Sequence, residues 1–376
     1  MKKRFFSVFI AALMLMSSFV YASATDEGST SLQSASEEVA LSFMRNSLGK
    51  ETDIEIQNTT PFYDLDGKVT AYCVSFLRDS KPGGYVLISL ITSGDPIVEF
   101  SFEGPSIADV IQEDSIMNIS RSNADTPIYY LGPEMLFLQG SKSTTVEDVI
   151  TGEEHQKEVV NAMYKDQLAK TPMPAYSNGE GILDWADSNI NSSSIYKITG
   201  FGNGSDYWLM DELSDGSVCA PTAATNVIWY WGVQRGRDWV LNSSATGYNL
   251  ASIIFNQMKR KMWTSTSLGT LDSAVRGAYV NYLEPKGKNY NTKILTQNSY
   301  SSFFAALNDN CPVHTMLRPS SSITAVGHDV MTFGYGKSKT GTNYLFVMDG
   351  WFDYGRFVKF SYYPIIKGVK VWVGEL

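Results

Sequence analysis

The chain of 376 residues is long enough for two domains of ordinary size. Apolar residues make up 43% of the sequence and aromatic residues 13%, which permits well-filled cores and excludes disorder as the general state. The formal net charge of −9 argues against nucleic acid as a partner, because binding to phosphates requires a basic face.

The first 24 residues have the order of a secretory signal peptide. Three basic residues at positions 2–4 precede an apolar run from Phe5 to Val20, and Ala22-Ser23-Ala24 supplies the small residues of a cleavage site. The alternative is a membrane anchor, since the apolar run approaches spanning length. The small-residue site favours cleavage near Ala24, so we expect an exported protein with no stable membrane anchor.

The three cysteines are Cys73, Cys219 and Cys311. A secreted scaffold that depends on disulfides would carry many more, and an odd number leaves room for a free thiol. So few cysteines in an exported chain of this size indicate bacterial secretion to an extracellular location.

Composition divides the chain near residue 176. All eight tryptophans lie between Trp185 and Trp372. From 25 to 176, 24 acidic residues stand against 10 basic ones, a net charge of −14, whereas from 177 to 376 the count is 15 against 17, a net of +2. The two prolines in Lys170–Pro174 disfavour helix, which suits a linker between domains. We therefore expect one domain over residues 25–176 and a second over residues 177–376.

The first domain is expected to be a small α+β module without a catalytic constellation. Its helix should span Ser36–Leu48 with Ser36 as cap, and His155 should lie on a solvated helix face. Turns are expected at Asp66-Gly67 and Lys81–Gly84, and strands at Asp53–Gln57, Pro61–Leu65, Val69–Arg78, Tyr85–Ile91 and Pro96–Phe102.

The second domain is expected to pack one main helix on an antiparallel sheet, an α+β arrangement. The helix should begin at Cys219, because Pro221 suits a first turn and the alanines that follow favour helix. Strands are expected near the end of the chain, at Cys311–Leu317, His328–Gly334, Tyr344–Asp349, Arg356–Tyr362 and Val369–Val373.

Cys219 is the candidate nucleophile. At a helix N-terminus the unpaired amides and the helix dipole stabilise a thiolate, which lowers the pKa of the thiol. A small core residue is the competing interpretation, because most lone cysteines have that role.

His328 and Asp349 favour the catalytic interpretation. If their strands form a hairpin centred between Ser338 and Lys339, Val330 pairs with Val347 and His328 with Asp349. An imidazole beside a carboxylate is oriented as the general base that a thiol requires. A slip of one residue in register would break this pairing.

These residues resemble those of papain-like cysteine peptidases. The helix start Cys219–Asn226, the Gly-His at His328 and the Asp349-Gly350-Trp351 run are similar to secreted bacterial branches of that group, the streptopain-like and the double-glycine-peptidase-like enzymes. The segments Ala71-Tyr72 and Gly83–Ser89 resemble a streptopain-like propeptide. The resemblance implies a papain-like fold, a Cys219–His328–Asp349 triad and an N-terminal propeptide that acts as an intramolecular inhibitor.

The sequence departs from the papain pattern at the oxyanion hole. Leu213 stands where papain-like enzymes commonly have glutamine, which leaves the Cys219 amide, joined by Ser217, Ser214 or Asn203, as candidate donors. His314 is expected to be a core or cleft-edge residue, and Cys311 a structural one.

We therefore expect a secreted cysteine endopeptidase, made as a zymogen, that acts on proteins or peptides. No metal-ligand spacing or cofactor fingerprint occurs, so neither metal nor cofactor is expected. Two alternatives remain: a cell-wall amidase or transglutaminase-like enzyme using the same thiol chemistry, and a non-catalytic binding protein on the same fold.

Overall fold

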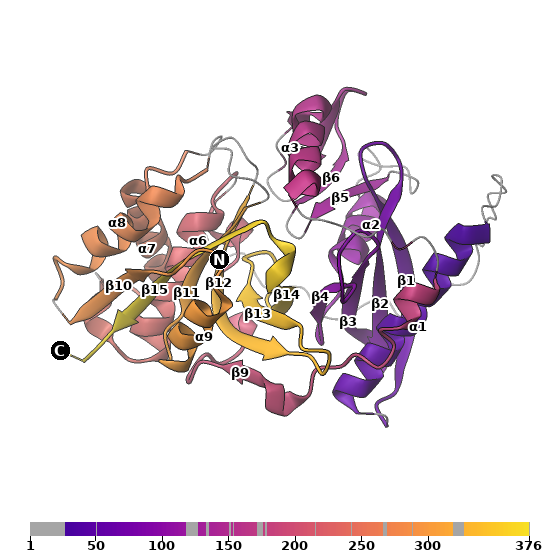
Figure 1. The fold of residues 1–376 in the computed structure, drawn as a ribbon. Helices are drawn as coiled ribbons and strands as arrows, with labels where there is room; N and C mark the ends of the chain where they lie inside the picture. The colour runs from indigo at the N-terminus through magenta and orange to yellow at the C-terminus, as the bar shows by residue number, and fades with distance from the viewer. Residues whose placement is uncertain are drawn as a thin grey trace.

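The structure is a computed structural model that describes residues 27–49, 51–117, 127–132, 135–149, 152, 154–170, 176, 179–214, 216–241, 243–265, 269–287, 289–318 and 327–375. The expected signal peptide, 1–24, and most of the Lys170–Pro174 segment lie outside the described residues. Helices surround one large sheet in which nearly all neighbouring strands are antiparallel (Figure 1). The mixed α+β class expected from the sequence is confirmed.

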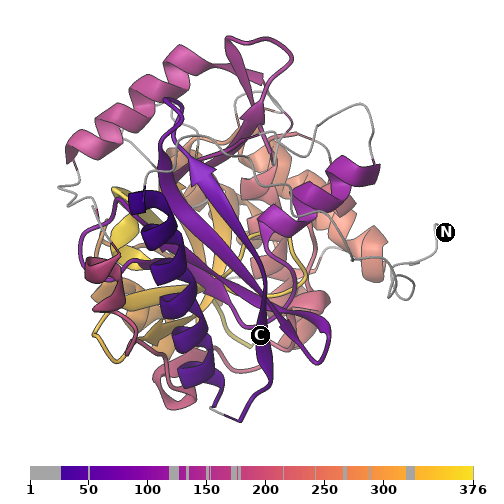
Figure 2. The ribbon, with the colours of Figure 1, turned by 90° about the vertical axis from the view of Figure 1, so that its right-hand side faces the viewer.

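The N-terminal half is a strand meander with α1 (Glu27–Leu48) packed against its first three strands (Figure 2). Val39, Ala40, Phe43 and Met44 of α1 are fully buried, as their spacing predicts. The strands are β1 (Ile54–Tyr63), β2 (Val69–Arg78), β3 (Lys81–Ser89), β4 (Ile97–Ser101), β5 (Ile128–Gly132), β6 (Met135–Gln139), β7 (Thr145–Asp148) and β8 (Glu154–Gln156), with the helices α2 (Ile107–Met117) and α3 (Lys157–Lys170).

Several local expectations for this half were wrong. Ser36 does not cap α1 but lies inside it, with its hydroxyl donating to the carbonyl of Leu32 at 2.8 Å. The second turn is at Asp79-Ser80, which both have positive φ angles, so β3 already begins at Lys81. His155 lies in β8 and packs on Phe137, because the helix that follows starts only at Lys157.

The C-terminal half has the expected arrangement of one buried helix on an antiparallel sheet. The central helix α6 (Cys219–Trp229) packs against β12 (His328–Lys337) and β11 (Val313–Arg318), and α7 (Gly247–Lys261) packs on α6 (Figure 1). The remaining elements are α4 (Glu180–Leu183), β9 (Ile195–Lys197), α5 (Met210–Leu213), α8 (Asp272–Leu283), β10 (Tyr290–Ile294), α9 (Tyr300–Asn308), β13 (Asn343–Met348), β14 (Arg356–Lys359) and β15 (Ile365–Val373).

The two halves share the sheet. Its strand order runs from β10 through β15, β11, β12, β13 and β14 directly into β4, β3, β2 and β1. At the junction β14 pairs antiparallel with β4, and Phe357 is stacked on Phe100 with ring centroids 4.7 Å apart. Strand pairing and stacked aromatic rings therefore hold the N-terminal half against the C-terminal half.

Candidate active site

Cys219 is the first residue of α6, as expected. Every residue of the helix from Ala220 to Trp229 is buried, rather than one face only. Apart from two threonines and one asparagine, the side chains of this segment are all apolar, so every face of the helix can pack against the protein. Pro221 occupies the first turn, where its missing N–H leaves no helix hydrogen bond unmade. A helix buried on all sides holds its N-terminal thiol at a fixed place in the fold.

The sulfur of Cys219 meets the start of β12. The main-chain amides of Asp329 and Ala220 donate to it, and the residue remains partly exposed. Burial of the sulfur and, second, the charge of Asp329 raise its pKa to about 12, although Arg318 acts to lower it. The expected lowering by the helix N-terminus is thus outweighed by desolvation, and the thiol is neutral in this state.

His328 is the first residue of β12 and is 4% exposed. Its Nε2–H donates to the main-chain carbonyl of Asp349 at 2.7 Å, and its ring packs on Trp351 with centroids 4.4 Å apart. Because a carbonyl only accepts, this bond places the proton on Nε2 and leaves Nδ1 with a lone pair. Burial lowers the pKa of the imidazole to about 4, an effect that Asp349 partly offsets.

The carboxylate of Asp349 faces away from that hydrogen bond. Its Oδ1 accepts from the amides of Trp351 at 2.7 Å and Phe352 at 3.2 Å, and its Oδ2 lies 2.5 Å from Nε of Arg356. Asp349 is 2% exposed, so the charge is satisfied by buried groups rather than by water.

The hairpin register expected for His328 and Asp349 was wrong. The observed pairs include Thr332 with Val347, and the register shifts by one before Gly334 pairs with Phe346. The turn is centred later than expected, because Gly341 adopts a positive φ of 89° and the amide of Thr342 binds Ser338. His328 and Asp349 are therefore joined through the Asp349 carbonyl.

A buried network that the sequence interpretation missed lies under the nucleophile. The carboxylate of Asp329 binds Nε2 of His314 at 2.9 Å and the guanidinium of Arg318 at 2.5 Å. Arg318 also donates to the carbonyl of His328 at 3.1 Å and pairs with Asp272. His314 is fully buried, as expected of a core residue. The sequence signal that could have revealed this network is the presence of Asp329 and Arg318 in strands that are otherwise mostly apolar.

Asn226 of α6 was also missed. Its side chain accepts from the amide of Trp208 at 2.9 Å and donates to the carbonyl of the same residue at 3.0 Å. Two residues later, the amide of Met210 donates to the carbonyl of Gly350 at 2.8 Å. This short segment ties the helix that carries Cys219 to the turn that follows Asp349.

The candidate oxyanion donors are distributed around the helix start. Leu213 is buried in α5 and has no polar side-chain group. The hydroxyl of Ser214 lies 3.5 Å from Nζ of Lys259, and the Asn203 amide donates to Asp206 in a 3₁₀ turn. These contacts single out no side chain that replaces the glutamine of papain-like enzymes.

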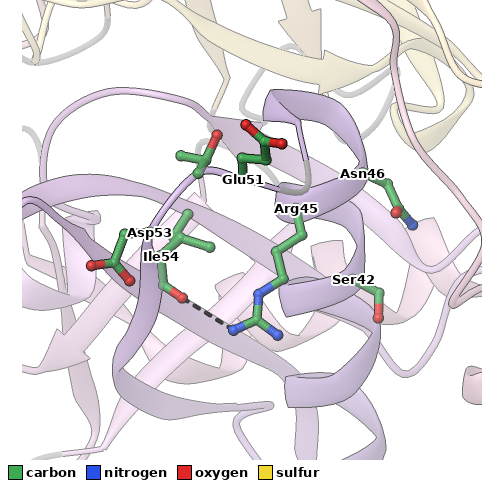
Figure 3. A pocket seen from close by; sticks show the side chains of 7 residues that line it. Ser42, Arg45, Asn46, Glu51, Asp53 and Ile54 are labelled. Carbon is green, nitrogen blue, oxygen red and sulfur yellow. Dashed lines mark hydrogen bonds between the residues drawn. The ribbon is translucent and has the colours of Figure 1, made fainter.

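In the part of the chain that the structure describes, no three metal-binding side chains form a cluster, and no helix combines the length and the apolar character of a membrane span. A surface hollow lies between α1 and β1, lined by polar residues that include Arg45, Asn46 and Asp53 (Figure 3). The hollow belongs to the N-terminal half and includes none of the candidate triad.

Residues 205–371 match the model of the Peptidase_C39 like family. A fragment of Prevotella intermedia prointerpain A is 11% identical in sequence, with 85% of this chain and 99% of that chain covered and a TM-score of 0.38. Bromelain from Ananas comosus, bound to the E64 inhibitor, is 12% identical over 48% of this chain and 95% of that one, with a TM-score of 0.21. A comparison with curated proteins gives no match.

The matched segment contains Cys219, His328 and Asp349 and most of the sheet against which α6 packs. Its elements have the mixed α+β order that the resemblance to papain-like enzymes implies. Residues 205–371, which are less than half of the chain, are thus similar to the Peptidase_C39 like family.

Proposed function

We propose that this chain is a secreted bacterial endopeptidase, made as a zymogen, in which Cys219 is the nucleophile, His328 the base and Asp349 the third member of the triad. The observation that carries the proposal is the meeting of α6 and β12, where the sulfur of Cys219 accepts from the amide that directly follows His328. The proposed nucleophile and base are thus the first residues of a helix and a strand that pack on each other.

The reaction begins from neutral partners. Nδ1 of His328 takes the thiol proton as the sulfur of Cys219 attacks a peptide carbonyl, forming the C–S bond. The resulting imidazolium then gives its proton to the leaving amine as the C–N bond breaks, which leaves a thioester. Water deprotonated by His328 releases the acid and restores the thiol.

The N-terminal half is the proposed inhibitory propeptide, spanning residues 25–176. Support comes from its net charge of −14, its position before the peptidase domain and its sheet junction with β14. Two basic residues at the end of α7 contact their own half: Lys261 donates to the carbonyl of Asn281, and Lys259 lies near Ser214. The junction strands are therefore the proposed docking surface.

A chain with a specific protease site placed within Lys170–Pro174 tests the proposal. Casein hydrolysis should be slow before the cut and at least tenfold faster after it, with no activity in a Cys219→Ala version. Equal activity before and after the cut would remove the inhibitory role. Turnover of peptidoglycan without cleavage of casein would instead favour the cell-wall amidase, and loss of both activities would favour the binding protein.

A further inference from the structure

Two opposite charges are buried at the junction between β4 and β14. Glu99 of β4 is 4% exposed and Arg356 of β14 is 1% exposed, and Oε1 of Glu99 lies 2.7 Å from Nη1 of Arg356. The hydroxyl of Tyr85 donates to the same oxygen at 2.5 Å. Because desolvation offsets most of the attraction in a buried ion pair, such a pair adds little stability beyond an apolar contact. A role in arranging neighbouring groups accounts for it better.

Arg356 also contacts the candidate triad. Its Nε lies 2.5 Å from Oδ2 of Asp349, and its guanidinium lies over the ring of Trp351, 5.2 Å from the centroid. Trp351 in turn packs on His328. One side chain therefore reaches from a carboxylate of the N-terminal half to both neighbours of the proposed base.

We propose that Arg356 is a positioning residue that holds the Asp349 carboxylate away from the His328 imidazole, and that Glu99 keeps Arg356 in this position while the N-terminal half is docked. This ionic latch, Glu99–Arg356–Asp349, rests on the proposed function and names a means of its regulation. Through this latch, a charge of the docked N-terminal half, that of Glu99, influences the position of the Asp349 carboxylate beside the proposed base.

The arrangement of donors explains why the latch holds. Asp349 already accepts two main-chain amides and faces a guanidinium, so turning toward His328 would break buried contacts. Arg356 stays dehydrated because β4 covers it and Glu99 neutralises it. Without β4, the guanidinium would lie at a sheet edge in water, where its attraction for Asp349 falls several-fold.

Other titratable groups also face this cluster, and the test must account for them. Besides Asp349, the charged groups that act on His328 are Asp329 and Arg356, and Arg318 donates to its main-chain carbonyl at 3.1 Å. Tyr354 and Tyr85 are buried beside Arg356 and Glu99, and burial raises the pKa of both phenols, which keeps them neutral. The latch residues, Asp329 and Arg318 are therefore the charged groups that the titration of His328 must take into account.

The test is an NMR titration of His328 in the full chain carrying Cys219→Ala, which prevents self-cleavage. A His328→Gln version assigns the signal among the three histidines of the sequence. The double variant Glu99→Gln/Arg356→Met removes the latch while conserving net charge. It should raise the pKa of His328 by about one to three units, because Asp349 is released to the imidazolium.

Asp95→Asn is the matched control. Asp95 is 3% exposed at the same junction and accepts from Thr340 and Thr342, but it contacts no triad residue. It should lower stability without moving the His328 titration. Arg356→Lys is the second variant, should the double variant fail to fold: a lysine cannot span both carboxylates, so His328 should titrate higher than in the parent chain.

An unchanged titration in the double variant or in Arg356→Lys, or an equal shift in Asp95→Asn, would overturn the latch. The readout needs no peptidase activity, so it is separate from the proposed function. If neither the uncut nor the cut chain cleaved casein, the proposed peptidase function would be wrong, but the result of the His328 titration would still hold.

Discussion

At the scale of residues, the candidate catalytic pair, Cys219 and His328, is neutral. Burial raises the pKa of Cys219 to about 12 and lowers that of His328 to about 4, so neither a thiolate nor an imidazolium is stable at neutral pH. The proposed reaction therefore starts from the neutral thiol and the neutral imidazole.

All three cysteines should resist alkylation in the folded chain, because burial raises the pKa of each thiol. In the full chain at neutral pH, Cys219 should react with iodoacetamide more slowly than a free peptide thiol, because the reactive thiolate is disfavoured. Peptide mapping by mass spectrometry measures each site. Cys311→Ala is the control and should leave the rate at Cys219 unchanged; fast labelling of Cys219 in the uncut chain would contradict the neutral resting state.

Acid should destabilise the fold through His328. Its pKa is about 4 when folded against an ordinary 6.5, so the unfolded chain binds more protons between these values and stability falls as pH drops through this window. The loss from this group approaches about 3 kcal/mol at the lower end. Urea unfolding from pH 7 to pH 4 measures it.

The comparison variant for acid stability is His328→Gln. Its free energy of unfolding should fall less between pH 7 and pH 4, because the carboxylates titrate in both proteins and only the imidazole differs. Parallel curves for the two proteins would show that His328 is not held neutral.

At the scale of elements, Asn226 connects α6 to the turn after β13. Replacing it with alanine leaves the partly buried amide and carbonyl of Trp208 without these partners, which costs about 1–3 kcal/mol. Chemical denaturation measures the loss, and peptidase activity after the cut should fall with it. Asn256→Ala on the exposed side of α7 removes only contacts within that helix and should change stability by less than about 0.5 kcal/mol.

The sequence predicts elements better than it predicts their pairing. The start of α6 and the late strands were found because proline, glycine and hydrophobic spacing mark them locally. The hairpin register was missed because a shift between Thr332 and Gly334 has no local sequence signal. Asp79-Ser80 was missed for a similar reason, since the turn uses positive φ angles at residues other than glycine.

In the candidate active site, too, the residues with a local motif were predicted and the long-range contacts were not. Cys219, His328 and Asp349 were selected by residue type and motif, and the structure brings the Cys219 sulfur to the His328–Asp329 segment. Arg356 and Glu99 were not found, because their contact spans 257 positions and depends on strand order across the whole sheet. A contact between residues so far apart in the chain produces no periodic pattern in the sequence from which it could be predicted.

At the scale of the whole molecule, one sheet connects the segment that matches the Peptidase_C39 like family to the N-terminal half. Although that half carries a net charge of −14, its contacts at the junction are stacked aromatic rings and buried ions at β4 and β14. Release of the N-terminal half would uncover Phe357 and Arg356 together, which links the exposure of the junction to the state of Asp349.

The most direct test of the account is covalent trapping at the nucleophile. The chain cut within Lys170–Pro174 is incubated with a peptidyl acyloxymethyl ketone, and the adduct is located by peptide mapping. We predict a single adduct on Cys219, at a rate reduced at least a hundredfold, on the order of general-base catalysis, by His328→Ala. Labelling of Cys73 or Cys311 instead, or labelling of Cys219 at an equal rate without the imidazole, would contradict it.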